Sequence, residues 1–184
     1  QGAHVVCLDR QGRAEAFVAE AGEGERLTAV SLDLTDTDAT RAWIGDPARP
    51  VADGVVFLTT PGATNAAFMT LTGDEFDQYN HVGLTCLFLA VQETGRRMQE
   101  RGSGSVVLFS SMYGIVSPDP RAYEAPMLPN PMQYGMHKAA ILQMTRYLGV
   151  AWGPRNVRVN AVVPGPFPNP GIQAAEPAFV ERLA

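Results

Sequence analysis

The sequence predicts an α/β fold with a doubly wound parallel sheet and helices on both of its faces. Three observations support this fold class. Short apolar runs alternate along the chain with longer amphipathic stretches, which is typical of βαβ units. The apolar runs are hydrophobic almost throughout, as expected of strands buried on both faces. Right-handed crossovers between such strands place helices on both faces of the sheet.

Five apolar runs predict the strands. Each run is short, and a polar or turn-forming residue follows it. The runs cover residues 3–8, 27–32, 51–58, 105–109 and 157–163.

Stretches with helical periodicity lie between these runs, and capping residues set their ends. Asp36 is a suitable N-cap, while Gly22, Gly102 and the pair Gly153-Pro154 are suitable stops. The expected helices cover residues 10–21, 36–44, 73–101 and 132–152, and a further one begins at 177.

Composition bounds the class of protein. A chain of 184 residues can form one domain with a hydrophobic core, so we expect a single domain over residues 1–184. The formal charge of −5 argues against a nucleic-acid partner or an anionic membrane surface. No apolar run approaches the ~20 residues that a membrane span needs.

Cysteine, histidine and the first residues of the chain complete this picture. Cys7 and Cys86 lie in apolar stretches and are interpreted as buried, reduced thiols. The three histidines lack metal-ligand spacing, so no metal site is expected. The chain opens on Gln1-Gly2-Ala3-His4 and not on a charged and then apolar leader. Together these features predict a cytoplasmic protein.

One segment is expected to be irregular. Residues 117–132 contain five prolines, which exclude a helix or a central strand. A long loop inside a compact domain is usually functional, and the alternative is a surface excursion without a role.

Tyr134 and Lys138 form the most informative pair in the chain. They are four residues apart in a predicted helix, so both side chains lie on one face. An ammonium group close to a phenol lowers the pKa of the phenol, and such a tyrosine can exchange a proton near pH 7. The alternative is a surface helix with a half-buried ring.

Other polar groups follow the predicted strands. In an open parallel sheet, ligands bind at the carboxyl ends of the strands. Asp9, Asp33, Ser110-Ser111 and Pro164-Gly165 come directly after four of the runs, and Asn80 lies in a long predicted helix.

In this order and spacing, the motifs resemble those of the short-chain dehydrogenases/reductases. The resemblance covers essentially the whole chain and implies a Rossmann-like sheet. Its pieces are Asp33 after the second strand, Tyr79-Asn80-His81-Val82-Gly83, Ser110-Ser111-Met112-Tyr113-Gly114, Tyr134-Gly135-Met136-His137-Lys138, and residues 156–165 ending in Pro164-Gly165.

The resemblance implies a role for each catalytic position. Tyr134 would be the general acid/base, and Lys138 would lower its pKa and bind the nicotinamide ribose. Ser111 would donate a hydrogen bond to the substrate oxygen. Asn80 would hold a water that links Lys138 to solvent. Two alternatives stay open. Ser111 could cap a turn, with Ser110 as the functional serine, and Asn80 could bond to neighbouring backbone.

The cofactor expected from the resemblance is NAD. A carboxylate at Asp9 can bind both hydroxyls of the adenosine ribose and repels a 2′-phosphate, although the neighbouring Arg10 could serve a phosphate. NADP is therefore the less favoured cofactor, and Asp9 could also cap the following helix. Asp33 is expected at the adenine, and the remaining expected cofactor contacts are Leu34, Tyr134, Lys138, Pro164 and Gly165.

The chain departs from the family pattern in two places. The glycine-rich phosphate loop is absent, together with the first strand, and the chain stops at Ala184, inside the region of the family's substrate lid. We expect an incomplete domain with two apolar strand edges left open. The family's Asn-Asn-Ala-Gly segment is also replaced, here by Thr59-Thr60-Pro61-Gly62.

Two functions remain as hypotheses. The leading one is an oxidoreductase that interconverts a secondary alcohol and a ketone on a polar small molecule. The rival is a non-catalytic binding or assembly module with an impaired cofactor site. A hydroxyl-rich or charged substrate such as a sugar derivative is suggested by polar residues of the proline-rich loop, namely Asp119, Arg121, Tyr123, Glu124 and Asn130. The helices at 73–101 and 132–152 predict a homodimer or homotetramer.

Overall fold

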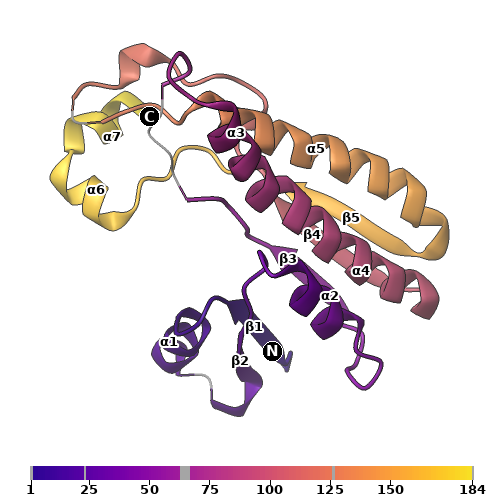
Figure 1. The fold of residues 1–184 in the computed structure, drawn as a ribbon. Helices are drawn as coiled ribbons and strands as arrows, with labels where there is room; N and C mark the ends of the chain where they lie inside the picture. Colours follow the sequence, from indigo (N-terminus) through magenta and orange to yellow (C-terminus); the bar gives the residue numbers. More distant parts are fainter. Residues whose placement is uncertain (1, 23, 63–66, 126, 184) are drawn as a thin grey trace.

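The computed structural model describes residues 2–22, 24–62, 67–125 and 127–183, and its strands are all parallel (Figure 1). They form two sheets. Strands β1 (Val5–Asp9) and β2 (Leu27–Ser31) pair in one. Strands β3 (Gly54–Phe57), β4 (Gly104–Phe109) and β5 (Val157–Val162) pair in the other, in the order β3-β4-β5. The five predicted strands are therefore confirmed, with ends that differ by at most three residues.

The helices lie where the periodicity places them, and short helical turns connect them. The α-helices are α1 (Arg13–Ala21), α2 (Thr37–Gly45), α3 (Gly73–Asn80), α4 (Cys86–Arg101), α5 (Met132–Trp152), α6 (Pro170–Ala175) and α7 (Pro177–Leu183). Asp36 caps α2 as predicted, because its carboxylate accepts the Ala39 N–H at 2.9 Å. Thr72 and Glu75 form a capping box at the start of α3.

The long helix predicted at residues 73–101 contains a break in its hydrogen-bond pattern. Residues His81–Thr85 form a π-helical segment between α3 and α4. A Cβ atom on Gly83 would lie 3.2 Å from the His137 ring and 2.8 Å from Pro61. His137 and Pro61 thus pack against the helix at Gly83, which has no side chain. Segments of π-helix often occur at functional sites.

The core lies between the three-stranded sheet and helices α4 and α5. Its fully buried members include Leu87, Met98, Val106, Leu108 and Val157. Gly95 of α4 allows close packing, since a Cβ there would lie 2.1 Å from the Trp152 ring of α5. This packing holds α4 against the C-terminal end of α5.

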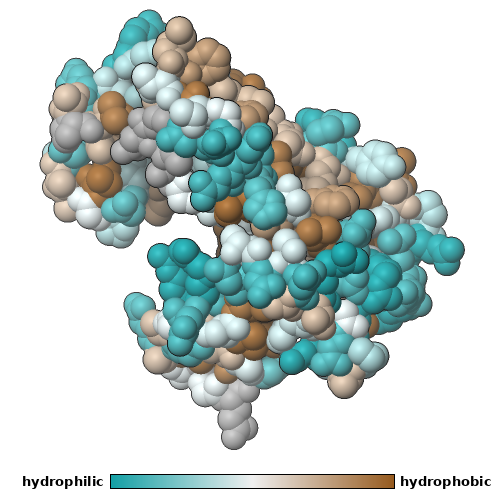
Figure 2. Space-filling model, in the orientation of Figure 1, coloured by the Kyte–Doolittle hydropathy of each residue, from teal (hydrophilic) through white to brown (hydrophobic). Residues whose placement is uncertain are grey.

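Burial of both faces was expected for every strand. It is wrong for β1 and β3, and β2 and β5 also have exposed residues. Val5 is 44% exposed and Val56 is 55% exposed. The physical reason is that β1 and β3 do not pair with each other, so each sheet keeps an open edge. Figure 2 shows a hollow between the part that carries α1 and the part that carries α6 and α7. The open apolar edges agree with the expectation from the sequence.

Smaller expectations also meet the structure. Cys7 and Cys86 are both free thiols, but only Cys86 is buried, because β1 lies in the open sheet. Helix α6 was not predicted. Among the helices of the described ranges, none combines the length and hydrophobicity of a membrane span.

Candidate functional site

The serine segment follows β4 and is fastened to α5. Ser110 is buried, and its hydroxyl donates a hydrogen bond of 2.7 Å to the carbonyl of Lys138. The hydroxyl proton of Ser110 is therefore engaged within the protein. This contact gives Ser110 a structural role and leaves Ser111 as the serine available to a ligand.

Ser111 begins the short helical turn Met112–Gly114. Its Oγ accepts the N–H of Tyr113 at 3.2 Å, which is the capping arrangement considered as an alternative. The two roles are compatible, because a hydroxyl can accept one hydrogen bond and still donate its own proton.

Two glycines bring this turn into backbone contact with α5. A Cβ on Gly114 would lie 2.7 Å from the carbonyl carbon of Lys138. A Cβ on Gly135 would lie 2.9 Å from the carbonyl oxygen of Tyr113. The close approach places Ser111 beside the helical turn that carries Tyr134 and Lys138.

Lys138 is buried beneath Tyr134. Its ammonium donates to the carbonyl of Phe109 at 3.0 Å and lies 5.6 Å from the centre of the Tyr134 ring. Burial lowers the pKa of Lys138 to about 8, because desolvation disfavours the charged form. Tyr134 itself is half-buried, so its ring reaches the surface of the site.

Asn80 ends α3, and its amide nitrogen donates to the carbonyl of Phe76 at 3.0 Å. This is the backbone bond considered as an alternative. The neighbouring Tyr79 is buried. Its pKa is raised to about 12, mainly by this burial and to a smaller extent by the nearby Tyr134.

The ends of β3 and β5 border the same region. The carbonyl of Pro164 accepts the N–H of Met112 at 3.0 Å, which ties the end of β5 to the serine turn and leaves Gly165 exposed beside it. Where the family has Asn-Asn-Ala-Gly, the Thr59 hydroxyl oxygen is buried and lacks a hydrogen-bond partner among the described residues.

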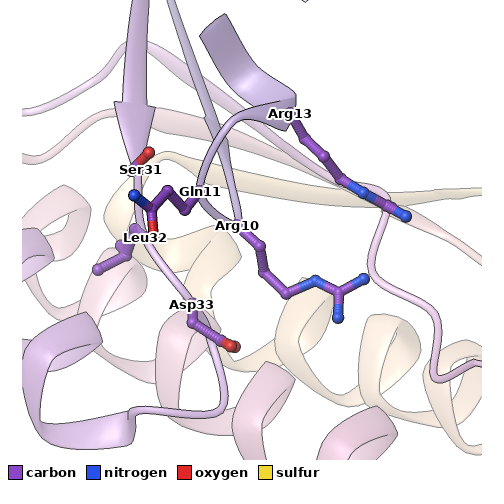
Figure 3. Close-up of a pocket in the computed structure, with 6 residues that line it drawn as sticks. All are labelled: Arg10, Gln11, Arg13, Ser31, Leu32 and Asp33. Carbon is purple, nitrogen blue, oxygen red and sulfur yellow. The ribbon is translucent and has the colours of Figure 1, made fainter. Parts of the chain in front are cut away.

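A second part of the site lies at the carboxyl ends of β1 and β2. An open pocket there has a volume of about 630 Å³. Figure 3 shows the six residues that line it, which are Arg10, Gln11, Arg13, Ser31, Leu32 and Asp33. The pKa of Asp33 is lowered, first by the backbone N–H of Thr35 and then by the Thr35 hydroxyl, with a smaller contribution from Arg10. The pocket is thus lined by a carboxylate and two guanidinium groups.

The expected cofactor residues divide between this pocket and its surroundings. Asp33 lines the pocket. The Asp9 carboxylate accepts the backbone N–H of Arg10 at 2.7 Å and is exposed just beside the pocket. Leu34 is half-buried and packs against the hydrophobic core. Sequence reasoning missed Gln11, Arg13, Ser31 and Leu32, although Ser31 and Leu32 end a predicted strand and could have been found from that position.

The polar residues of the proline-rich loop have different partners. Asp119 pairs with Arg121 at 2.6 Å, and this pairing lowers the pKa of Asp119 to about 2. Glu124 pairs with Arg182 of α7 at 3.3 Å. Asn130 lines a second pocket, of about 460 Å³, between the loop and the start of α5. No group of His, Cys, Asp and Glu suited to a metal ion occurs in the part of the chain that the structure describes.

Fold and site together define a doubly wound α/β protein of the Rossmann type, and comparisons with known proteins name its family. A family model described as enoyl-(acyl carrier protein) reductase matches residues 1–182. The chain belongs to the short-chain dehydrogenase/reductase family.

Two curated dehydrogenases are similar to this chain in sequence. It is 30% identical over 169 residues to the probable galactose dehydrogenase GalD of Rhizobium meliloti (strain 1021), covering 90% of this chain and 62% of that protein. It is 29% identical over 165 residues to galactitol 2-dehydrogenase (L-tagatose-forming) of Cereibacter sphaeroides, covering 89% and 61%.

The structural comparison gives the same family. A short-chain dehydrogenase from Leptospira borgpetersenii with bound NAD+ matches with a TM-score of 0.79 and 27% identity, over 98% of this chain and 66% of that one. The chain spans about three fifths of the length of the curated relatives that it matches.

Proposed function

We propose that residues 1–184 form one Rossmann-like domain of an oxidoreductase that interconverts a secondary alcohol and a ketone with a nicotinamide cofactor. One observation carries this proposal. In a member of this family, backbone contact between the serine turn and α5 gathers Ser111, Tyr134 and Lys138 at the carboxyl end of β4.

The three side chains have complementary tasks. The Tyr134 hydroxyl exchanges a proton with the substrate oxygen as general acid or base. The Ser111 oxygen already accepts the Tyr113 N–H, so its own O–H donates to the substrate oxygen and stabilises charge that develops there. The Lys138 ammonium, held by the Phe109 carbonyl, stabilises negative charge on the Tyr134 oxygen.

Proton supply completes the site. Asn80 is proposed to hold a water between Lys138 and solvent. Its amide nitrogen bonds to Phe76, so its side-chain oxygen is the atom that would bind the water.

The residues present fit a nicotinamide cofactor, which supplies hydride transfer when it is bound. Lys138 has three N–H donors, and the Phe109 carbonyl takes one of them, which leaves donors for ribose hydroxyls. The Thr59 hydroxyl, which has no partner among the residues that the structure describes, offers a further polar contact. Asp33, Leu34, Pro164 and Gly165 are proposed as the remaining contacts.

NAD is the proposed cofactor, because the Asp9 carboxylate can bind two ribose hydroxyls and repels a 2′-phosphate. Arg10 and Arg13 of the neighbouring pocket favour the opposite choice. The ratio of kcat/KM with NAD to that with NADP tests this. A ratio above one that falls in Asp9→Ala supports the proposal, and a ratio below one contradicts it.

A polar small molecule, such as a sugar derivative, is the proposed substrate. The two curated relatives named above are described as dehydrogenases of a sugar and of a sugar alcohol. We further propose a cytoplasmic homodimer or homotetramer assembled through α4 and α5. Phe88 of α4 and Val150 of α5 expose apolar side chains for such a contact.

The decisive experiment removes the hydroxyl group of Tyr134. Tyr134→Phe is expected to lower kcat/KM for a panel of sugars and polyols by about 100-fold or more, the usual range of general acid–base catalysis. The control is Tyr147→Phe, which removes the hydroxyl of a tyrosine that is 71% exposed on the same helix. Equal activity of Tyr134→Phe and the unaltered protein would refute the proposal.

A fluorescence titration with NADH distinguishes the rival function. An oxidoreductase should bind NADH in the micromolar to millimolar range. Absence of binding at millimolar NADH favours a non-catalytic binding or assembly module.

A further inference from the structure

The proline-rich loop is connected to the serine turn by a pair of tyrosines. The hydroxyls of Tyr113 and Tyr123 form a hydrogen bond, and both rings are half-buried. Tyr113 is the residue whose N–H binds the Ser111 oxygen. A residue of the loop is therefore one hydrogen bond away from the residue that orients Ser111.

Tyr123 is itself held from the other side. Its ring packs against Phe179 of α7, with ring centres 5.3 Å apart, and Phe179 is buried. The neighbouring carbonyl oxygen of Ala122 accepts a hydrogen bond of 3.0 Å from Nε of Arg182. The C-terminal helix thus fixes the loop segment from which the Tyr123 hydroxyl reaches Tyr113.

Contacts at its carbonyl and at its hydroxyl hold Tyr113 in place. Its carbonyl rests against Gly135 of α5, which limits movement towards the helix. Its hydroxyl is restrained by the hydrogen bond to Tyr123. If that bond is lost, the Tyr113 N–H can move away from Ser111. The Ser111 oxygen then no longer accepts a hydrogen bond from Tyr113, and the Ser111 proton is no longer held towards a ligand.

We propose that Tyr123 is a positioning residue for Ser111 and acts through the hydroxyl and the backbone N–H of Tyr113. The role in catalysis rests on the proposed function, whereas the effect on the serine turn does not. The proline-rich loop and α7 then determine how well Ser111 is oriented, although neither contributes the reacting hydroxyls.

Two measurements on Tyr123→Phe test this inference, and this variant keeps the ring that packs on Phe179. Amide hydrogen exchange in residues 112–116 is expected to become roughly tenfold faster, about the effect of one lost hydrogen bond. The value of kcat is expected to fall about tenfold while KM stays nearly constant, because Ser111 acts on charge in the transition state. Tyr147→Phe is the matched control for both measurements.

A double-mutant cycle with Tyr113→Phe separates positioning from direct contact with substrate. If the two hydroxyls act only on each other, the double variant loses no more activity than either single variant. A much larger loss in Tyr113→Phe than in Tyr123→Phe would mean that Tyr113 binds the substrate, and it would overturn the inference.

The remaining outcomes are also decisive. Unchanged exchange in Tyr123→Phe overturns the inference whatever the activity, and faster exchange with unchanged kcat shows a structural role only, which also overturns it. If Tyr134→Phe retains full turnover while Tyr123→Phe still accelerates exchange, the proposed function fails and the coupling of Tyr123 to the serine turn stands.

Discussion

At the scale of single residues, burial decides the chemistry of α5. Lys138 and His137 are adjacent, and both are buried, although each has a polar head group. Lys138 reaches a carbonyl oxygen, whereas both ring nitrogens of His137 lack a hydrogen-bond partner in the described structure. Their pKa values both fall, and each shift leads to a measurable pH dependence.

The lowered pKa of Lys138 predicts a descending limb in the pH profile of kcat/KM for ketone reduction. Its pKa is lowered to about 8 by burial, so the ammonium loses its proton as the pH rises through that value. The value of kcat/KM is expected to fall over the same range. In Lys138→Arg this limb should be absent, because guanidinium stays charged. A limb near pH 8 that persists in Lys138→Arg would assign the titration to another group.

His137 predicts a loss of stability in acid. Burial, followed by the charge of Lys138, lowers its pKa from 6.5 to about 4. Between these values the unfolded chain binds a proton that the folded protein does not. The free energy of unfolding is therefore unaffected by His137 above pH 6.5, where the ring is neutral in both states. It decreases by about 3 kcal/mol as the pH falls from 6.5 towards 4.

The measurement compares the unaltered protein with His137→Gln in urea at several pH values. The difference between their free energies of unfolding should change by about 3 kcal/mol between pH 7 and 4. A constant difference would contradict a buried, neutral His137.

At the scale of elements, glycine sets the distance between the serine turn and α5. A Cβ on Gly135 would meet the Tyr113 carbonyl at 2.9 Å, and backbone cannot yield as a flexible side chain can. The two elements therefore need glycine at this contact. The same helix contains Gly149, where a Cβ would meet only the Val159 carbonyl, at an ordinary 3.7 Å.

These two glycines make a matched pair of substitutions. Gly135→Ala is expected to destabilise the protein by about 1–3 kcal/mol, as overpacking does. Gly149→Ala is expected to stabilise it by up to about 1 kcal/mol, because alanine favours a helix interior. Thermal unfolding of both variants measures the difference, and equal transition temperatures would mean that the turn does not rest on α5.

At the scale of the whole molecule, exposed apolar side chains occur on several elements, and two groups of them bear on assembly. One group lies at the sheet edges left open at β1 and β3, with Val56 more than half exposed. The other is on α4 and α5, where Phe88 and Val150 are exposed. Either surface could drive association, and the proposed assembly uses the helices.

Sedimentation velocity separates the two surfaces. Val150→Glu is expected to shift an oligomer towards the monomer, because burying a carboxylate in an apolar contact is unfavourable. Val56→Lys is the control and should leave the sedimentation coefficient unchanged, since a charge on an open edge blocks only strand pairing. The reverse result would place the contact at the strand edges.

The order of the elements and the places of the candidate site residues could be predicted from local sequence pattern. Strand positions, the Asp36 cap and the limits of α5 agree with the structure, because periodicity and capping are local. The spacing of Tyr134 and Lys138, and the polar residues after the strands, could likewise be predicted from position alone. Helix α6 could not, since so short a helix carries little periodic signal.

Which polar groups already have hydrogen-bond partners within the protein is seen only in the three-dimensional structure. The structure assigns Ser110 to the Lys138 carbonyl, and it shows the π-helical segment packed against His137. It also separates β1 from β3 and pairs Tyr113 with Tyr123. The physical reason is the same throughout. Hydrogen-bond partners, strand neighbours and burial depend on residues far apart in the chain, and local pattern does not specify them.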